Sequence, residues 1–300
     1  MSRSFIKKEG LAQATLARYL LGEKKGNRLK TIDELATECQ FSVGLTQAAL
    51  KTLENAGAVT VDRRGRNGSY LVSMDNKALL AFADIGNVVC AMPLPYTRLY
   101  EGLASGLKAQ FDGIPFYYAH MRGSDVRVEC LLNGVYDLAV VSRLAAQSYL
   151  DNGEVCMALE LGAHTYVGEH TLICRADCAD IRRVGLDPRS ADQRIMTEIC
   201  FGARQVERLD VPYHDCLSHI ARGDIDAAIW NVANEADLAS HGLVAKPLTG
   251  DVRFVQASEA VVLTRRDDIP IQQLLRTVVD KSALLNHQQR VLSGLQEPSY

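Results

Sequence analysis

The sequence has 300 residues, 47% of them hydrophobic and 23% charged, which suits two or three folded domains and excludes a disordered chain. No run of eighteen apolar residues is present, and residues 1–25 lack the apolar centre and cleavage site of a signal peptide, so we expect a cytoplasmic protein with no membrane contact. The net charge of −3 is the sum of +4 in residues 1–75 (12 basic, 8 acidic) and −7 in residues 76–300 (21 basic, 28 acidic). A basic N-terminal part favours contact with nucleic acid, although chance variation in composition would give the same difference.

Two helices are predicted near the N-terminus. An amphipathic pattern indicates a first helix that ends near Gly22 or Gly26, with a stripe formed by Leu11, Ala14, Thr15, Ala17, Arg18 and Leu21. The sequence TIDE then predicts a capping box, because Thr31 can accept from the backbone of Glu34 while Glu34 reaches back to the backbone of Thr31. Ile32, Leu35 and Ala36 would form the apolar stripe of a short second helix.

A third helix and a hairpin follow. Ser42 is placed to cap the third helix, Ala49, Leu50 and Leu53 to form its buried face, and Gly57 to end it. Two alternating runs, 58–62 and 69–72, flank the basic sequence RRGRNG and predict a hairpin. This order of elements is typical of a winged helix-turn-helix, in which the third helix enters the major groove of DNA.

The sequence IDELATECQFSVGLTQAALKTLENAGAV, with GRNGSYLV after it, resembles the head of GntR-type bacterial repressors over about forty-five residues. Those repressors usually carry Arg just after the capping Ser and again five residues after it, where this chain has Val43 and Gln47. We therefore expect Gln47 to contact an adenine edge and the wing to supply positive charge. The predicted DNA contacts are Thr31, Ser42, Thr46, Gln47, Lys51, Arg63, Arg64 and Arg66. The arginine-poor helix leaves open a degenerate head that binds protein as an adaptor.

An internal repeat dominates the rest of the chain. The sequence LLNGVYDLAVVS (131–142) returns 89 residues later as IARGDIDAAIWN (220–231), and each copy reads as a helix end, a glycine turn and a buried strand. The continuous apolar run favours a parallel sheet that is covered on both faces. Strand and helix patterns before each copy predict two α/β lobes joined by crossing segments, and the C-terminal tail would return to the first lobe with a strand and a closing helix.

The repeat resembles an element of LysR-type effector domains and solute-binding proteins, which implies a type 2 periplasmic-binding-protein fold with a small ligand between two lobes. Ligands in such sheets lie beyond the carboxyl ends of strands and at helix N-termini, where anions are favoured. Trp230 or Tyr96 could form an apolar wall. The predicted ligand contacts are Pro95, Tyr96, Thr97, Arg122, Ser124, Ser142, Arg143, Arg189, Ser190 and Asn231. Because three of these are arginines, we expect an anionic metabolite, although each arginine could equally be part of an ordinary ion pair.

The remaining motifs are weak. His214 and His219 flank Cys216, but without a second pair of ligands we expect no metal site. The eight cysteines are scattered, mostly in apolar runs, and are expected to be small buried side chains. The usual catalytic signatures are absent, so we expect no enzyme and no cofactor. An enzyme built on the same scaffold stays an alternative, with Cys156 or Cys216 as the reactive thiol.

Nearly the whole chain is similar to the YhfZ family of bacterial regulators, in which a GntR-like head is joined to a two-lobed binding domain. The fold class predicted is therefore α/β, with a winged helix-turn-helix at 1–74, a linker at 75–87 and a two-lobed effector domain at 88–300, whose second lobe spans about 170–248. The resemblance implies a transcriptional regulator. We expect it to bind its DNA operator as a homodimer and to respond to a small-molecule effector.

Overall fold

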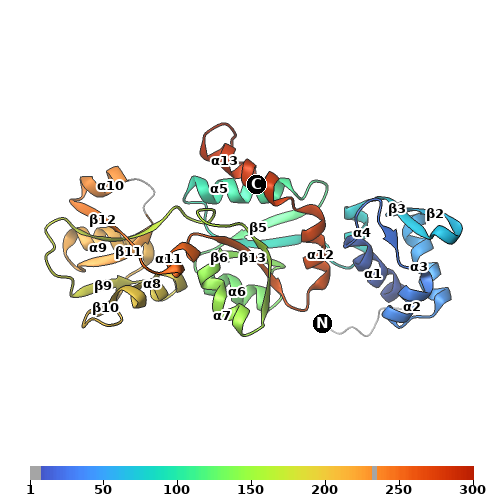
Figure 1. Ribbon diagram of the computed structural model, residues 1–300, viewed down its shortest axis with the longest axis horizontal. Helices are drawn as coiled ribbons and strands as arrows, with labels where there is room; N and C mark the ends of the chain where they lie inside the picture. The colour runs from blue at the N-terminus through green and yellow to red at the C-terminus, as the bar shows by residue number, and fades with distance from the viewer. Residues whose placement is uncertain (1–7, 232–234) are drawn as a thin grey trace. The chain divides into compact units, whose positions relative to one another are not determined.

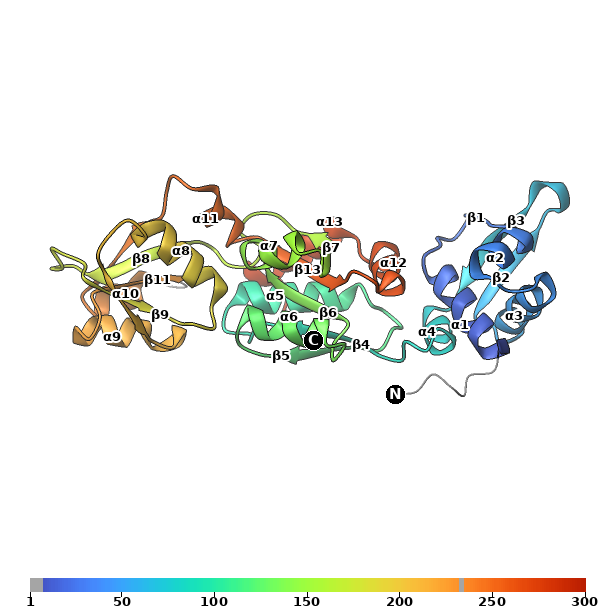
Figure 2. The same cartoon turned by 90° about the horizontal axis from the view of Figure 1, so that it is seen from below.

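The computed structural model describes residues 8–231 and 235–300 and divides into two compact units. The first unit contains the described residues up to Val89, together with Ala109–Tyr117 and Asp267–Val279. Its elements begin with α1 (Lys8–Leu21), β1 (Arg28–Leu29), α2 (Ile32–Cys39), α3 (Val43–Asn55), β2 (Val59–Arg63), the 3₁₀ turn η1 (Gly65–Asn67), β3 (Ser69–Met74) and α4 (Asn76–Phe82). The predicted winged helix-turn-helix is confirmed, with a small sheet in the order β1-β3-β2 (Figure 2). We call the segment from α1 to α4 the head.

The predicted ends of the head helices are confirmed. Thr31 and Glu34 form the capping box of α2, and Ser42 caps α3. Gly57 follows α3 with a φ of 73°, a left-handed conformation that glycine adopts without steric cost. The buried face of α1, however, differs from the predicted stripe.

The buried face of helix α1 matches the predicted stripe only in part. Ala17 and Leu21 of that stripe are 0% exposed, whereas Leu11 is 46% exposed. The prediction missed Ala12, Leu16 and Leu20, which are at most 1% exposed and repeat every four positions, so they lie one above another on the helix. The predicted stripe also included Arg18, whose Nε donates to the carbonyl of Ala83 at 3.0 Å.

Two further helices complete the first unit. The segment predicted as a linker forms α4, in which Leu79 and Leu80 are buried, and α4 contacts α1. Helix α12 (Ile269–Val278) comes from near the C-terminus, and it also contacts α1. The hydroxyl of Thr277 in α12 donates to the carbonyl of Leu21 at 3.1 Å. The N-terminal unit therefore includes a segment from the far end of the chain.

Two five-stranded sheets form the two lobes. The first lobe has the strand order β5-β4-β6-β13-β7 and the second lobe the order β10-β9-β11-β8-β12. Helices cover the faces of both sheets (Figure 1). In chain order the elements are β4 (Val88–Met92), α5 (Arg98–Ala109), β5 (Phe116–His120), α6 (Ser124–Leu132), β6 (Leu138–Ser142), α7 (Arg143–Asp151), β7 (Val155–Glu160), β8 (His170–Arg175), β9 (Arg183–Leu186), α8 (Ala191–Phe201), β10 (Glu207–Asp210), the 3₁₀ turn η2 (Tyr213–Asp215), α9 (Cys216–Arg222), β11 (Ala227–Asn231), α10 (Glu235–Ser240), β12 (Leu243–Pro247), α11 (Val252–Gln256), β13 (Ala260–Arg265) and α13 (Lys281–Leu292).

Both sheets are mixed, so the prediction of a parallel sheet is wrong in this respect. Strand β6 pairs in parallel with β4 and antiparallel with β13, and β11 likewise pairs with β9 and β8. All five residues of β6 are buried. A central strand buried on both faces is continuously apolar whatever the direction of its neighbours, and the apolar run alone therefore did not reveal the antiparallel partner.

The internal repeat is confirmed in three dimensions. In the first lobe, the guanidinium of Arg265 on β13 donates to the carbonyls of Leu131 and Tyr136, at 3.2 and 2.9 Å. In the second lobe, Arg175 on β8 makes the same two bonds, at 2.9 and 3.1 Å, to the residues 89 positions further along. In each lobe, an arginine of the antiparallel strand thus holds together the end of a helix and the turn that follows it.

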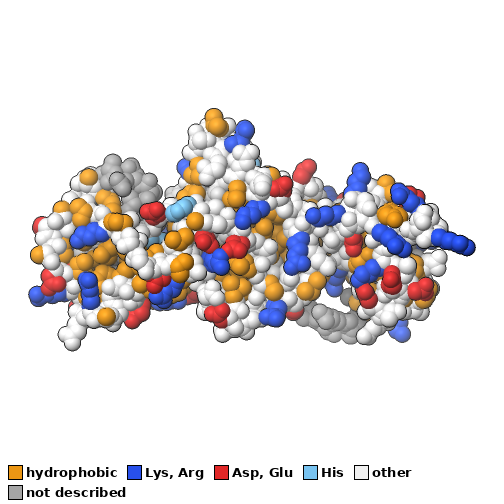
Figure 3. Space-filling view, viewed as in Figure 1, with side chains coloured by type: hydrophobic (Ala, Val, Ile, Leu, Met, Phe, Trp, Pro, Cys, Tyr) orange, Lys and Arg blue, Asp and Glu red, His pale blue; other side chains and the backbone are white. Residues whose placement is uncertain are grey.

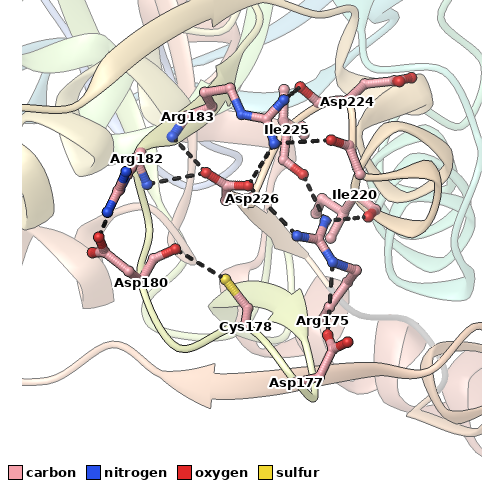
Figure 4. Close-up of polar contacts among 11 residues, drawn as sticks. Arg175, Asp177, Cys178, Asp180, Arg182, Arg183, Ile220, Asp224, Ile225 and Asp226 are labelled. Atoms are coloured by element: carbon pink, nitrogen blue, oxygen red, sulfur yellow. Dashed lines mark hydrogen bonds and ion pairs between the residues drawn. The ribbon is translucent and has the colours of Figure 1, made fainter.

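The second lobe also contains a buried carboxylate, that of Asp226 (Figure 4). Asp226 is 6% exposed and accepts from the guanidinium of Arg183 at 2.8 Å, and from the backbone N–H groups of Arg182 and Arg183 at 3.0 and 2.8 Å. Burial alone would raise the pKa of Asp226, but these hydrogen bonds outweigh it and lower the pKa to about 2. The carboxylate joins β9 to the turn before β11 and is a structural feature of this lobe.

Two crossing segments, 161–169 and 248–259, connect the lobes as predicted. The two segments are hydrogen-bonded to each other, since the N–H of Tyr166 donates to the carbonyl of Ser258 at 2.9 Å. The N–H of Leu161 in the first segment also donates to the carbonyl of Ala260, the first residue of β13, at 3.0 Å. The chain then returns to the first lobe through β13 and the closing helix α13. No helix of the described ranges has both the length and the apolar character needed to span a membrane.

Candidate functional site

The exposed face of α3 carries few cations. Gln47 and Lys51 are exposed, as predicted for a DNA-reading surface. Thr46 was also predicted to face outward, and this is wrong: its side chain is 0% exposed and its hydroxyl donates to the carbonyl of Ser42 at 3.1 Å. Thr46 therefore cannot contact DNA. The hydroxyl of Ser42 accepts from the N–H of Leu45 at 3.3 Å, so Ser42 positions the first turn of α3.

Two of the three predicted wing arginines are paired inside the head. Arg63 forms two parallel bonds to the carboxylate of Glu54 in α3, at 2.9 and 2.6 Å. Arg64 donates to Asp62 at 2.7 Å and lies over the ring of Tyr70, 4.5 Å from its centroid. Both arginine side chains stay more than half exposed. These ion pairs are weak in water, so the arginines can exchange them for phosphate contacts.

Arg66 and Arg28 complete the positive charge of the wing. Arg66 is exposed in η1 at the hairpin tip, and none of the ion pairs found in the described part of the chain involves it. Arg28 lies on β1 beside the hairpin, so close to Gly68 that a Cβ there would be 2.6 Å from its Nε. Arg28 was missed in the sequence because β1 has two residues and therefore no detectable period.

A groove with a volume of about 480 Å³ brings several of these residues together. Leu16, Leu20 and Leu50 contribute apolar surface to it. The polar residues that line it include Lys30, Thr31, Gln47, Lys51, Glu54 and Arg63. Four predicted DNA contacts therefore share one surface of the head. Basic and acidic side chains both occur on the face of the head that Figure 3 shows. Thr31 is held by its capping box, with its N–H donating to Glu34 at 2.7 Å.

The two lobes meet at the N-terminus of α7. Ser142 caps this helix by accepting from the N–H of Ala145 at 3.0 Å, and its hydroxyl donates to the carboxylate of Asp192 in α8 at 2.6 Å. Ser142 is 0% exposed and Asp192 is 9% exposed. Burial raises the pKa of Asp192 to about 6, although the hydrogen bond from Ser142 and the charge of Arg127 oppose the shift. A buried carboxylate from the second lobe thus occupies the start of a helix in the first lobe.

Aromatic and apolar side chains surround this contact. The rings of Tyr100 and Tyr166 meet edge to face with centroids 5.1 Å apart, and those of Tyr213 and Trp230 stack at 5.4 Å. Burial raises the pKa of Tyr166 and of Tyr213, so both phenols stay protonated. Beside them, one apolar cluster joins Leu144 of the first lobe to Met196 and Ile229 of the second. The lobes are therefore closed against each other.

Arg127, which was not predicted from the sequence, anchors the first-lobe side. It is 3% exposed and donates to the carbonyls of Val140 and Met121, each at 2.9 Å, and to the hydroxyl of Tyr166 at 2.8 Å. These bonds satisfy a buried cation and fix the position of the tyrosine. Arg127 lies in the middle of α6, away from the strand ends where ligand contacts were sought, and nothing in its local sequence marks it as buried.

The three arginines predicted to bind an anion differ in their contacts. Arg143 is paired with Glu160 and Glu259 in its own lobe. Arg122 donates to the hydroxyl of Tyr96 at 2.7 Å and lies 2.9 Å from Nδ1 of His214 in the second lobe.

The third arginine, Arg189, is exposed, and the described residues supply no ion pair or hydrogen bond to its side chain. Its backbone approaches the first lobe, since a Cβ on Gly123 would lie 3.4 Å from the carbonyl oxygen of Arg189. Arg189 therefore differs from Arg122 and Arg143, whose guanidinium groups are already engaged.

The other predicted ligand contacts lie at the expected strand and helix ends. Thr97 accepts from the N–H of Tyr100 at 3.3 Å, and Ser190 caps α8 by accepting from Gln193 at 3.3 Å. Ser124 begins α6 and is 8% exposed. Tyr96 and Pro95 are exposed, and Tyr96 interacts with Arg122 as described above. Trp230 donates to the carbonyl of Tyr213 at 2.8 Å.

Two buried polar atoms at the paired ends of β8 and β11 in the second lobe have no hydrogen-bond partner within the described ranges. They are Nδ1 of His170 and Oδ1 of Asn231, two residues that face each other across the β8–β11 pair. Burial lowers the pKa of His170 to about 4, so the ring is neutral. The backbone N–H of Asn231 donates to the hydroxyl of Tyr213 at 2.8 Å. A buried polar atom without a partner costs about 1–3 kcal/mol.

Three residues named for metal and thiol chemistry, His214, His219 and Cys216, have other surroundings, and Cys156 is partly exposed. His214 contacts Arg122 and Asp215, and His219 lies 3.1 Å from Asp224. Over the described ranges, no three His, Cys, Asp or Glu side chains are grouped so that they could hold a metal ion. Cys216 is buried, and burial raises the pKa of its thiol to about 11, so it is protonated at neutral pH.

Comparison with known proteins gives matches over both parts of the chain. Residues 75–300 match the family described as YhfZ C-terminal domain, and residues 24–71 match the one described as Helix-turn-helix domain. The chain is 73% identical to the YhfZ protein of Escherichia coli (strain K12) over 301 residues, which cover 100% of each chain.

Solved structures give two further likenesses. The crystal structure of YhfZ from Shigella flexneri is 72% identical, with a TM-score of 0.69 over 75% of this chain and 98% of that chain. The periplasmic aliphatic sulphonate binding protein SsuA from Escherichia coli is 12% identical, with a TM-score of 0.50 over 70% of this chain and 75% of that chain. At 12% identity this second likeness shows the fold alone, which is the predicted periplasmic-binding-protein fold.

Proposed function

This chain belongs to the YhfZ family, and we propose that it is a cytoplasmic transcriptional regulator that binds DNA through its head and a small anionic effector between its two lobes. The observation that supports this most directly is the presence in one chain of a winged helix-turn-helix and a two-lobed binding fold. Neither part carries a recognisable catalytic signature. A regulator of this kind would act as a homodimer, because two heads related by a two-fold axis read two half-sites.

DNA binding by the head would be divided between α3 and the wing. Gln47 is exposed on α3 and can read an adenine edge, whereas Arg64 and Arg66 are exposed on the wing and can contact phosphates. Because the other outward positions of α3 carry no arginine, the wing would supply much of the affinity.

We expect the double variant Arg64→Ala/Arg66→Ala to weaken binding to all duplexes and to reduce the slope of log K against log salt by about 0.9 for each phosphate that is no longer neutralised. Gln47→Ala should instead relax the preference at one base position, which would be visible when bound duplexes are selected from a random library. Arg222→Ala, which removes an exposed arginine of the second lobe, is the control. Unchanged affinity and salt dependence in the double variant would contradict this assignment.

The anionic effector can be tested with a thermal-shift screen of small carboxylates and phosphates, because a ligand that binds the folded state raises its apparent stability. For a compound found in this way, we expect Arg189→Ala to weaken binding about tenfold. Arg143→Ala should have less effect, since Arg143 is already paired with Glu160 and Glu259. Equal affinity in the Arg122, Arg143 and Arg189 variants and the wild type would rule out this mode of binding.

A further inference from the structure

The outward face of α3 carries a single charge. All residues of this helix are described, and those that are exposed are Val43, Gly44, Gln47, Ala48, Lys51 and Asn55. The first four of them lie in the first two turns, and none of these four is charged. In a helix-turn-helix the N-terminal residues of the second helix contact base edges. We therefore call Val43, Gly44, Gln47 and Ala48 the reading face.

The reading face lacks the charged groups that recognise G·C pairs. Guanine is read most often by Arg or Lys, and cytosine is read by a carboxylate. Lys51 is the one cation of α3, and it lies eight residues, or about 12 Å, beyond Val43 along the helix. Glu54 is the one acidic residue of α3, and its carboxylate is bonded to Arg63 of the wing. Neither charge is therefore part of the reading face.

The groups that the reading face does carry suit A·T pairs. The amide of Gln47 can bond to N6 and N7 of adenine, and the methyl groups of Val43 and Ala48 can contact the C5 methyl group of thymine. Val43 is 47% exposed and lies one helical turn before Gln47 on the same side of α3. Their Cβ atoms are about 5–6 Å apart, and base pairs are about 3.4 Å apart, so the two side chains can reach base pairs one or two steps apart.

Gly44 indicates that the reading face approaches another surface closely. Its conformation is helical, and alanine is a better helix former than glycine. A Cβ at this position would have no heavy atom within 4 Å, so the packing of the head does not require glycine here. Glycine does allow the backbone of a protein to lie close to a ligand. Because the side chains of Val43 and Ala48 are short, a close approach would bring their methyl groups to the base edges.

We propose that α3 reads an operator half-site made of A·T pairs. Val43 contacts the C5 methyl group of a thymine, Gln47 bonds to the edge of an adenine one or two base pairs away, and Gly44 lets the helix lie close enough for both contacts. This inference rests on the proposed function and names the class of DNA sequence that the head binds. Lys51 and the wing then contact phosphates, which position the head without reading the sequence.

The test starts from full-length protein and a random library of DNA duplexes, from which bound duplexes are selected. We expect the selected half-sites to share at least two A·T pairs within about three base pairs. Each thymine of the selected duplex is then replaced in turn by deoxyuridine, which lacks only the C5 methyl group. At one thymine this replacement should weaken wild-type binding about fourfold, as expected when one methyl group is no longer buried, and fluorescence anisotropy measures the change.

The variant Val43→Ala assigns that methyl group to its partner. If the two groups are in contact, deoxyuridine at the same thymine should weaken binding of Val43→Ala by less than about twofold. Val252→Ala is the matched control, because it makes the same change at a valine that is 69% exposed on α11, and it should keep the whole fourfold effect.

The variant Gly44→Ala tests the close approach. Its thermal unfolding midpoint should equal or exceed that of the wild type, because alanine is the better helix former and its Cβ meets no other atom of the head. Its affinity for the selected duplex should nevertheless fall about tenfold, because the added methyl group lies between the helix and the bases. A glycine with only a structural role would not give these two opposite effects.

Three results would overturn the inference and leave the proposed function standing. They are selected half-sites built on G·C pairs, an equal effect of deoxyuridine on wild type and Val43→Ala at every thymine, and wild-type affinity in Gly44→Ala. A library from which no sequence is enriched would overturn the proposed function as well, and it would favour a head that binds protein.

Discussion

Replacement of Asp226 by alanine should lower the free energy of unfolding of the second lobe by about 3 kcal/mol or more, because removal of one partner leaves the others of a buried ionic cluster unsatisfied. Asp226 accepts from two backbone N–H groups and from Arg183, and Arg175 approaches it to 3.5 Å (Figure 4). Urea unfolding followed by circular dichroism measures the decrease. Asp224→Ala removes an exposed carboxylate of the same turn and should cost no more than about 0.5 kcal/mol.

The same carboxylate gives a pH signature. The pKa of Asp226 is lowered to about 2 in the folded protein, whereas an aspartate in an unfolded chain titrates near 3.9. Its contribution to stability is therefore complete above about pH 4 and is lost as the pH falls toward 2. Wild type and Asp226→Ala should converge in stability over this acidic range. A constant difference between them from pH 7 to pH 2 would contradict the assigned pKa.

Replacement of Leu53 by alanine should destabilise the head by about 2–5 kcal/mol and abolish DNA binding at 37 °C. Leu53 is 0% exposed on α3, and α3 packs against α1, so the cavity would lie beneath the predicted reading helix. The measurements are thermal unfolding and the retention of duplex DNA in a gel. Leu11→Ala, at a position 46% exposed on α1, is the control and should behave as wild type. Tight DNA binding by Leu53→Ala at 37 °C would show that the head does not depend on this core.

Sequence patterns that span a few neighbouring residues predicted most of the helices and strands. Capping residues such as Thr31 and Ser42 act over three or four positions, and a sequence shows such spacings directly. Thr46 shows how the same rules can be misapplied. It precedes Ala49, Leu50 and Leu53 by three, four and seven positions, so helical spacing places it on the buried face, but its hydroxyl suggested a DNA contact.

Contacts between side chains that are far apart in the sequence could not be predicted from such spacings. Arg143 looked like an anion ligand because its partners, Glu160 and Glu259, are 17 and 116 positions away. Asp192 looked like an ordinary acidic residue in the first turn of a helix, which the helix dipole favours without any partner. Its contact with Ser142 joins two residues that are 50 positions apart and lie in different lobes, so no local pattern shows it.

Helix α12 determines when the DNA-binding unit is complete during synthesis. Ribosomes release the chain from its N-terminus, and most N-terminal domains fold before the rest is made. Here the first unit includes Asp267–Val279, and α12 contacts α1. The packing of that unit is therefore finished only after about nine-tenths of the protein has been translated. A prematurely terminated chain would lack α12 and therefore part of the packing around α1. On the proposed function, such a chain would lose effector control and would also bind its operator poorly.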